Sequence, residues 1–425
     1  MVSRPARDPD GAPMPSYAQV FATRGYLPLF LAASLSTWGD FLARVTVAAF
    51  VFQQTRSPLA AAATFAVSLL PTLFGRSLLA PLADRIPYKY VLIASHLARA
   101  VLVGALIVAV GSGVSLGVLF ALLFALELAG GPAPAASQIL MTDLFADRRL
   151  YVRAMGLGAL SEQVNQAVGI GFGGLVVAVV GTGGALWFDL ATFVLSAAVF
   201  ALVARARPPV GAASAGVFGF FADIMQGARY LLREPVLVYL LALSLCTVWA
   251  GAAPEAVAIA YAAGKDPSGS VRLGGLLMAA PMLGAVFGLL VVGRWAPPRA
   301  NLRIMPMALL MPLPLVVTAA APPVLVTWLL WFVCGALQSF MLPLQATFSL
   351  VIPAHMRARV FGLGGAASVA FGGVAYLVAG ALAQLSSPAT AVAICASLAL
   401  LAIVLLATRA PSEQLRAAVA AAYGP

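Results

Sequence analysis

Nine ionisable side chains lie inside long apolar stretches of the sequence. At the centre of a membrane-spanning helix each such group costs at least ~2.5–3.5 kcal/mol, so each is a candidate for function. Carboxyl and guanidinium groups in such surroundings can exchange protons, pair with one another or hold a charged ligand. The candidates are Asp40, Arg44, Arg76, His96, Arg99, Glu127, Glu162, Asp189 and Glu255.

Asp40 and Arg44 are four residues apart, a spacing that places both on one face of a helix. One interpretation is an ion pair that neutralises itself beside a wet cavity. The other is that Asp40 takes up and releases a proton, because a movement that changes its distance to Arg44 also changes its affinity for the proton. Asp40 is our first candidate for proton coupling.

Glu127 has three interpretations. It can itself take up a proton, it can bind a cationic ligand, or it can form a buried pair with Arg99 or Arg76. Gly and Pro residues follow it at positions 130–134, and they are expected to loosen or kink this helix.

Three further carboxyl groups each have a functional and a structural interpretation. Glu255 follows Pro254 in a predicted helix, where it suits a cationic ligand, or it is a charge at the outer surface. Asp189, near the outer end of its apolar stretch, anchors a neighbouring helix or takes part in coupling. Glu162, near the inner end of its stretch, is structural or functional.

The composition is that of a polytopic membrane protein. Of the 425 residues, 62% are hydrophobic and 9% are charged, and the mean hydropathy is +1.00. Soluble domains have about 25% charged residues. The net charge of +11 comes from Lys and Arg residues scattered singly and in pairs rather than gathered on one face, so we expect no nucleic-acid partner.

Several other classes of site are not expected. Cys246, Cys334 and Cys395 lie in apolar segments and predict neither a disulfide framework nor a metal site. His96 and His355 have no Cys or carboxylate at metal-ligand spacing. A phosphate-binding G-x-x-x-x-G-K-[ST] motif is absent from the sequence, so ATP is not the expected energy source. We therefore predict no enzyme and no cofactor.

Hydropathy predicts twelve spans, each long enough to cross a bilayer as a helix. In the connecting segments, nineteen of the 25 Lys and Arg residues fall on one predicted side and three on the other. Because cytoplasmic loops carry the excess of positive charge, both termini are expected in the cytoplasm. The predicted spans are 26–52, 58–82, 90–111, 115–140, 154–180, 184–204, 236–262, 271–293, 302–321, 323–350, 360–384 and 388–408.

An internal repeat divides the chain. Arg153-Ala-Met-Gly-Leu157 opens the fifth predicted span, and Arg359-Val-Phe-Gly-Leu363 opens the eleventh, 206 residues later. A repeat at about half the chain length predicts two six-helix halves. The expected parts are a cytoplasmic tail (1–24), an N-terminal bundle (25–204), a linker with an amphipathic helix (205–235), a C-terminal bundle (236–410) and a second cytoplasmic tail (411–425).

Residues 80–89, APLADRIPYK, form a charged turn between the second and third predicted spans. The turn resembles the signature G-x-x-x-D-R/K-x-G-R/K-R/K of the major facilitator superfamily. Asp84, Arg85 and Lys89 stand at the signature's Asp, basic and last basic positions. Alanine and proline replace its two glycines, and tyrosine replaces a basic residue. With the repeat, this resemblance implies the major facilitator fold: an all-α membrane protein of twelve helices in two pseudo-symmetric halves.

Other segments resemble the drug:proton antiporter branch of that superfamily, which includes macrolide efflux pumps and enterobactin exporters. They are Gly39-Asp40, Gln54-Thr-Arg-Ser-Pro-Leu59, Trp187-Phe-Asp189 with Ser196, and Gly227-Ala-Arg-Tyr-Leu-Leu-Arg-Glu-Pro235.

The resemblance also implies a cytoplasmic gate. In the family, the aspartate at the position of Asp84 clasps the cytoplasmic start of the eleventh helix. That start carries Arg357 and Arg359 in this chain, and Arg85 and Lys89 are expected to act at the same gate.

Two further motifs match only in part. The run Gly169-Ile-Gly171-Phe-Gly173-Gly174 resembles the antiporter motif G-P-x-x-G-G, with isoleucine in place of the proline. It implies close helix packing or a bend at a closing gate. Glu127 stands where the fourth-helix motif of proton antiporters has an arginine, which puts arginine-based coupling in doubt.

The resemblance implies a monomeric transporter of the bacterial cytoplasmic membrane that exports amphipathic small molecules in exchange for protons. Its halves would rock about a midplane site. The alternatives are an uncoupled facilitator or importer of a small metabolite, and a non-transporting membrane sensor or scaffold on the same fold. The residues expected to serve the cavity or proton coupling are Asp40, Arg44, Arg99, Glu127 and Glu255.

Overall fold

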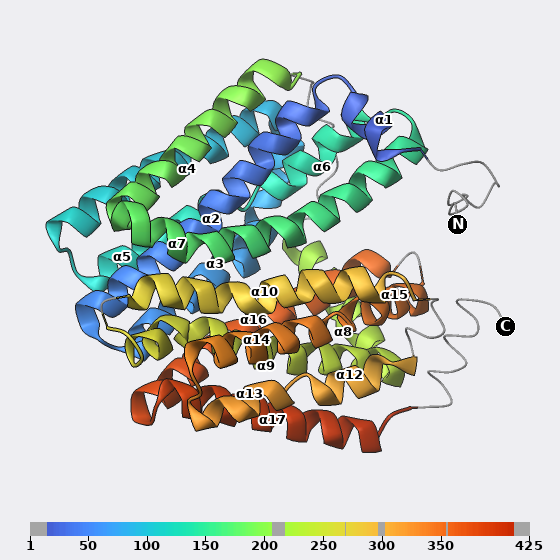
Figure 1. Ribbon diagram of the computed structural model, residues 1–425. Helices are drawn as coiled ribbons and strands as arrows, with labels where there is room; N and C mark the ends of the chain where they lie inside the picture. Colours follow the sequence, from blue (N-terminus) through green and yellow to red (C-terminus); the bar gives the residue numbers. More distant parts are fainter. Residues whose placement is uncertain (1–14, 206–216, 268, 296–301, 354–355, 412–425) are drawn as a thin grey trace. The chain divides into compact units, whose positions relative to one another are not determined.

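Figure 1 shows the computed structural model, which describes residues 15–205, 217–267, 269–295, 302–353 and 356–411. For some helical residues, including 72–85 and 217–224, it describes the backbone alone. Within the described ranges the chain is helical and contains no β-strand. The predicted all-α fold class is confirmed.

The helices before residue 206 are connected by short segments. In chain order they are α1 (Tyr17–Ala22), α2 (Tyr26–Thr55), α3 (Pro58–Arg85), α4 (Tyr88–Ser112), α5 (Leu116–Ala129), α6 (Ala133–Leu144) and α7 (Arg148–Val203).

The later helices begin with α8, which is the predicted linker helix. They are α8 (Val217–Arg233), α9 (Pro235–Ala263), α10 (Ser270–Val292), α12 (Ile304–Leu310), α13 (Leu313–Val317), the 3-10 helix η1 (Thr318–Ala320), α14 (Val324–Gln338), α15 (Met341–Val351), α16 (Arg357–Leu385) and α17 (Pro388–Thr408).

The chain divides into two compact units. Three helices, α2, α3 and α7, contribute residues to both, so the units differ from the halves 25–204 and 236–410, which stay a prediction. Unit 1 comprises Met1–Ala43, Phe74–Gly169 and Gly183–Ala212, and unit 2 comprises Arg44–Leu73, Ile170–Thr182 and Ala213–Pro425.

Among the described residues, nine helical segments are long and apolar enough to cross a membrane, and they fall on nine of the predicted spans. The predicted spans 58–82, 154–180 and 302–321 fall on α3, on the first part of α7 and on α12 to η1. Two of these contain shorter apolar helical segments, Pro58–Pro71 and Ile304–Ala320. The total of twelve therefore stays a prediction.

Two helix boundaries have local causes. The predicted fourth span is observed as α5 and α6, with Gly130, Gly131 and Pro132 between them, because proline lacks the N–H that continues a helix. The predicted loosening after Glu127 is confirmed. The fifth and sixth predicted spans meet inside α7 at Gly181, whose φ of 74° and ψ of 171° are accessible to glycine without strain.

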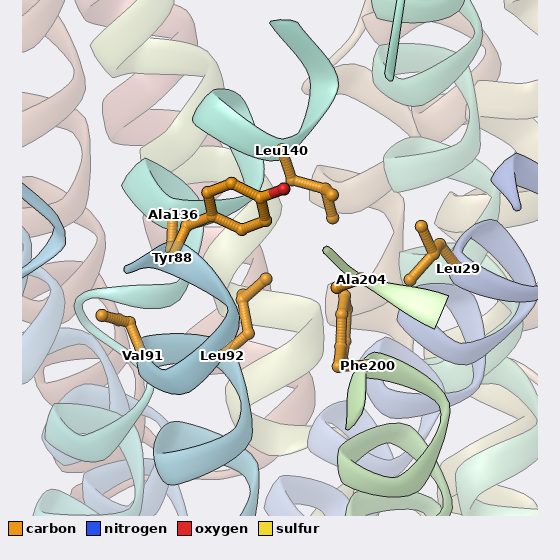
Figure 2. Close-up of a cluster of buried hydrophobic side chains, with 8 residues drawn as sticks. All are labelled: Leu29, Tyr88, Val91, Leu92, Ala136, Leu140, Phe200 and Ala204. Atoms are coloured by element: carbon orange, nitrogen blue, oxygen red, sulfur yellow. The ribbon is translucent and has the colours of Figure 1, made fainter. Parts of the chain in front are cut away.

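A buried apolar cluster holds α2, α4, α6 and the end of α7 together within unit 1 (Figure 2). Tyr88 and Phe200 supply its aromatic rings, and small residues fill the gaps between them. Such packing, rather than exclusion of water, drives helix association in lipid. The cluster consists of Leu29, Tyr88, Val91, Leu92, Ala136, Leu140, Phe200 and Ala204.

The two copies of the internal repeat hold corresponding short helices. Arg153, near the start of α7, lies over the ring of Tyr17 in α1, 3.9 Å from its centroid. Arg359, near the start of α16, donates a hydrogen bond to Gln226 Oε1 in α8 at 2.8 Å. Arg153 thus contacts α1, the helix that precedes α2, and Arg359 contacts α8, the helix that precedes α9.

In unit 2, α10 packs closely along α14, and Figure 1 shows the two running side by side. Glycines make this approach possible. A Cβ atom at Gly335 would collide with the carbonyl oxygen of Pro281, and one at Gly284 would collide with that of Phe332. Small residues serve the same purpose in other membrane helix pairs.

We predict that Gly335→Ala destabilises the protein by about 1–3 kcal/mol, because the added methyl group overpacks the α10–α14 contact. Thermal unfolding in detergent measures the change. The matched control is Gly365→Ala in α16, where a Cβ atom would meet nothing within 4 Å. Equal unfolding temperatures for the two variants would contradict the role of Gly335.

Candidate functional site

A buried ion pair joins α2 and α4 in unit 1. Arg99 Nη2 donates to Asp40 Oδ1, and the side chains are only 8% and 19% exposed, respectively. The guanidinium group also lies over the ring of Phe193 in α7, with Cζ 4.4 Å from the ring centroid. Arg99 is therefore held between a carboxylate and an aromatic face, both of which favour its positive charge.

Asp189 of α7 brings a second carboxyl group to this pair. It is fully buried, and its Oδ1 lies directly against the Cα of Gly39, the residue before Asp40. Its Oδ2 accepts no hydrogen bond from the described side chains. Asp189 interacts electrostatically with Asp40, Arg99 and Glu127.

Glu127 supplies a third carboxyl group from the last turn of α5, and it is also buried. The break after α5 lies against Arg99, since a Cβ atom at Gly130 would be 3.4 Å from Arg99 Cζ. Ser95 Oγ of α4 donates to the carbonyl of Ala129 at 2.7 Å and fixes this end of α5.

His96 lies beside Arg99 on the same helix, three residues earlier. It is buried and stacks on Phe200 of α7, with ring centroids 5.2 Å apart. The ionisable cluster of unit 1 thus comprises Asp40, His96, Arg99, Glu127 and Asp189, and it draws on α2, α4, α5 and α7.

Among the described residues, no three His, Cys, Asp or Glu side chains are placed to hold a metal ion. The ionised carboxyl groups would carry three negative charges, and Arg99 contributes one positive charge. Because uncompensated charge is costly in an apolar interior, the spacing of these groups affects the electrostatic free energy of the cluster.

A cavity of about 380 Å³ lies between α2, α6 and α7 within unit 1. Its wall reaches Thr37, one helical turn before Asp40. The lining combines the apolar side chains of Tyr26, Phe30, Met141 and Met155 with the polar ones of Ser34, Thr37, Ser137, Gln138, Ser161, Glu162 and Asn165.

Hydrogen bonds connect this cavity wall to the helix that carries Asp40. Trp38 Nε1 donates to Asn165 Oδ1 at 2.8 Å, and Asn165 Nδ2 donates to Ser161 Oγ at 3.0 Å. A ligand that displaced Asn165 would therefore remove the hydrogen-bond acceptor of Trp38.

The sequence profile of the Major Facilitator Superfamily matches residues 29–375. The chain belongs to this superfamily. It is therefore a membrane transporter of the major facilitator type.

One relative and two solved structures illustrate the similarity. A Bacillus subtilis (strain 168) protein described as the uncharacterized MFS-type transporter YfmI is 26% identical over 236 residues. That match covers 54% of this chain and 57% of the relative, so the chain spans little more than half of the relative's length.

The nucleoside transporter NupG has a TM-score of 0.65 at 14% identity, covering 89% of this chain and 98% of its own. A POT family transporter in complex with a thioalcohol conjugated peptide has a TM-score of 0.71 at 10% identity, covering 96% and 98%. At these identities the structures show the shared fold alone.

The gate residues of this major facilitator transporter are only partly described. The side chains of Asp84 and Arg85 lie outside the described residues, although α3 continues through both. Lys89 Nζ donates to the carbonyl of Ala201 at 2.6 Å. Arg357 donates to the carbonyl of Ile352 at 3.4 Å, and Arg359 donates to Gln226 of α8. The predicted gate therefore stays a prediction.

In the glycine run of α7, the first glycine, Gly169, allows close packing against α2. A Cβ atom at Gly169 would lie 2.8 Å from Cβ of Phe41 in α2. The backbone keeps helical dihedral angles through Gly171, Gly173 and Gly174, and it leaves them at Gly181 instead.

The remaining predicted residues, Arg44 and Glu255, belong to unit 2. Glu255 is half-buried and accepts a hydrogen bond from Tyr376 at 2.7 Å. The structure thus brings Asp40, Arg99 and Glu127 together in unit 1 and places the other two candidates elsewhere.

Three residues of these sites, His96, Asp189 and Tyr376, are not among those expected to serve the cavity or proton coupling. The sequence leaves both an anchoring and a coupling role open for Asp189, and the small residue Gly39 leaves room for its carboxyl group beside Asp40. Tyr376 carries no charge in its resting form, and its hydrogen bond to Glu255 spans 121 residues, so no local pattern reveals it.

We predict that Gly39→Ala displaces Asp189 and costs about 1–3 kcal/mol of stability. Gly111→Ala in α4 is the control, because a Cβ atom there would meet nothing within 4 Å. The double variant Gly39→Ala/Asp189→Ala should lose less than the sum of the single losses, since the second change makes room for the methyl group. Additive losses in thermal unfolding would contradict this contact.

Proposed function

We propose that this transporter exports amphipathic small molecules in exchange for protons, with Asp40, Glu127 and Asp189 as the proton-binding groups. The observation that supports the proposal is a group of three carboxyl groups near the Arg99 guanidinium: Glu127 and Asp189, which are buried, and Asp40, which is partly buried. His96 faces the same cluster from α4 and stacks on Phe200.

The electrostatics of the cluster explain how protons could drive transport. With two protons on its carboxyl groups the cluster is neutral, and it becomes negative when they leave. A proton on Asp40 removes the charge that holds Arg99, so α2 and α4 lose their ion pair. Proton binding thus favours a different arrangement of these helices, which is the requirement for coupling.

The cavity between α2, α6 and α7 supports the proposed substrate class. A volume of about 380 Å³ lies within the ~300–1,000 Å³ range of small-molecule sites. Its aromatic and methionine side chains suit the apolar part of an amphipathic molecule, and its hydroxyl and amide groups suit the polar part. Export, rather than import, rests on the resemblance of the sequence segments to drug and siderophore exporters.

The proposed arrangement keeps the topology expected from the sequence. Twelve spans form two pseudo-symmetric halves of a monomer, and both termini lie on the cytoplasmic side, where most of the Lys and Arg residues fall. The membrane is the bacterial cytoplasmic membrane.

Energised inside-out vesicles loaded with a pH-sensitive dye test the coupling. A lipophilic cation, a macrolide and a catecholate siderophore serve as probes. At least one probe should release lumenal protons with the wild-type protein, and Asp40→Asn should abolish the release because it removes a titrating group and the partner of Arg99. Asp266→Asn, in the connection between α9 and α10, is the control and should keep the wild-type response.

Substrate binding should also depend on pH. When protons and substrate compete, substrate affinity rises as pH rises, and coupling free energies of 1–3 kcal/mol correspond to roughly 5–150-fold. Titration of the active probe into purified protein at several pH values measures this. Asp40→Asn should lose most of the dependence, whereas Asp266→Asn should retain it.

The uncoupled alternative gives the opposite results. A facilitator or importer would bind or move a probe without proton flux, and its affinity would not change with pH. A protein that binds no probe and moves none would favour a sensor or scaffold.

A further inference from the structure

Tyr376 and Glu255 join two helices of unit 2 by a hydrogen bond. The phenol of Tyr376 in α16 donates to Glu255 Oε2 in α9 at 2.7 Å. Both residues are half-buried, and Glu255 follows Pro254 inside α9. A carboxylate that already accepts this bond is better suited to hold helices together than to bind a cationic substrate.

Residues from the N-terminal part of the chain complete the contact. The ring of Phe65 in α3 stacks on Tyr376 with centroids 5.5 Å apart and an interplanar angle of 29°. Arg44 of α2 interacts electrostatically with both Glu255 and Tyr376. Four helices, α2, α3, α9 and α16, therefore meet at this hydrogen bond within one compact unit.

A seam of small residues runs from this point along α3 and α16. A Cβ atom at Gly372 would lie 3.5 Å from Leu69 Cδ1. One at Gly380 would lie 2.6 Å from Ala62 Cβ and 3.0 Å from Leu59 Cα. The beginning of α3, just after Arg56 and Ser57, is thus packed tightly against the later part of α16.

We propose that the Tyr376–Glu255 hydrogen bond, with Phe65 stacked on it and Arg44 beside it, is a latch that keeps the transporter closed at the Arg56–Ser57 end of α3. The charge distribution of the sequence predicts that this end faces outward. Tyr376 and Glu255 are positioning residues in this role, because they bias one closed arrangement and need not touch the substrate.

The chemistry of the seam suits a contact that opens and closes. Small residues allow close approach without interlocking side chains, so α3 can leave α16 without rearranging either helix. When the seam opens, water can replace the hydrogen bond. The latch therefore stabilises the closed arrangement only by the net free energy of a hydrogen bond to a charged group. That value corresponds to a population shift of roughly tenfold to hundredfold.

The latch does not depend on proton coupling, and its test needs neither substrate nor a pH gradient. Spin labels at Arg56→Cys and Ser386→Cys, both exposed in unit 2, report the distance across the seam by pulsed electron resonance. The background lacks Cys246, Cys334 and Cys395. Tyr376→Phe removes the hydroxyl group and keeps the stacked ring, so the population with the longer distance should rise about tenfold.

The control for Tyr376→Phe is Tyr261→Phe. Tyr261 also lies in unit 2, and its hydroxyl group is 2.8 Å from Thr327 Oγ1, but this bond joins α9 to α14, away from the seam. The control should leave the distance distribution unchanged, although it too loses a tyrosine hydroxyl group that makes a hydrogen bond.

Gly380→Ala tests the latch by a second route, should Tyr376→Phe fail to fold. Its methyl group would wedge α3 away from α16 and should shift the distances in the same direction. Gly373→Ala is its control, since a Cβ atom there would meet nothing within 4 Å. If Tyr376→Phe and Gly380→Ala give the same distance distributions as their control variants, the latch is overturned.

Discussion

The free-energy cost of charge in an apolar interior governs the arrangement of unit 1. Arg99 is tolerable between the helices because Asp40 and the ring of Phe193 surround it. Removing one partner of a buried pair typically costs about 3–5 kcal/mol, since the other charge is then uncompensated. The break between α5 and α6 and the approach of Asp189 to Gly39 both bring further polar groups to this pair.

Glycine decides where helices can meet around these charges. Gly39 admits a carboxyl group, Gly130 admits the guanidinium group of Arg99, and Gly380 admits α3 against α16. At Gly39 and Gly380 a Cβ atom would occupy the space of the neighbouring group, whereas at Gly130 it would be in ordinary contact with Arg99. The same residue type thus contributes to the proposed proton-binding cluster and to the seam of the proposed latch.

Helix α2 carries one charged residue toward each compact unit. Asp40 pairs with Arg99 in unit 1, and Arg44, one turn later, interacts with Glu255 and Tyr376 in unit 2.

Hydropathy, proline and glycine in the sequence predict the class of protein, most helix positions and the break after Glu127, because these signals act over one or two helical turns. The sequence also identifies Asp40, Arg99, Glu127 and Glu255 as ionisable groups within apolar stretches, since their cost in lipid does not depend on the fold. Which of them meet depends on how the helices pack. The spacing of Asp40 and Arg44 predicts a pair within α2, and the structure adds an ion pair from Asp40 to Arg99 across 59 residues and a hydrogen bond from Tyr376 to Glu255 across 121. Such pairings follow from how whole helices pack, and local sequence patterns do not record the packing.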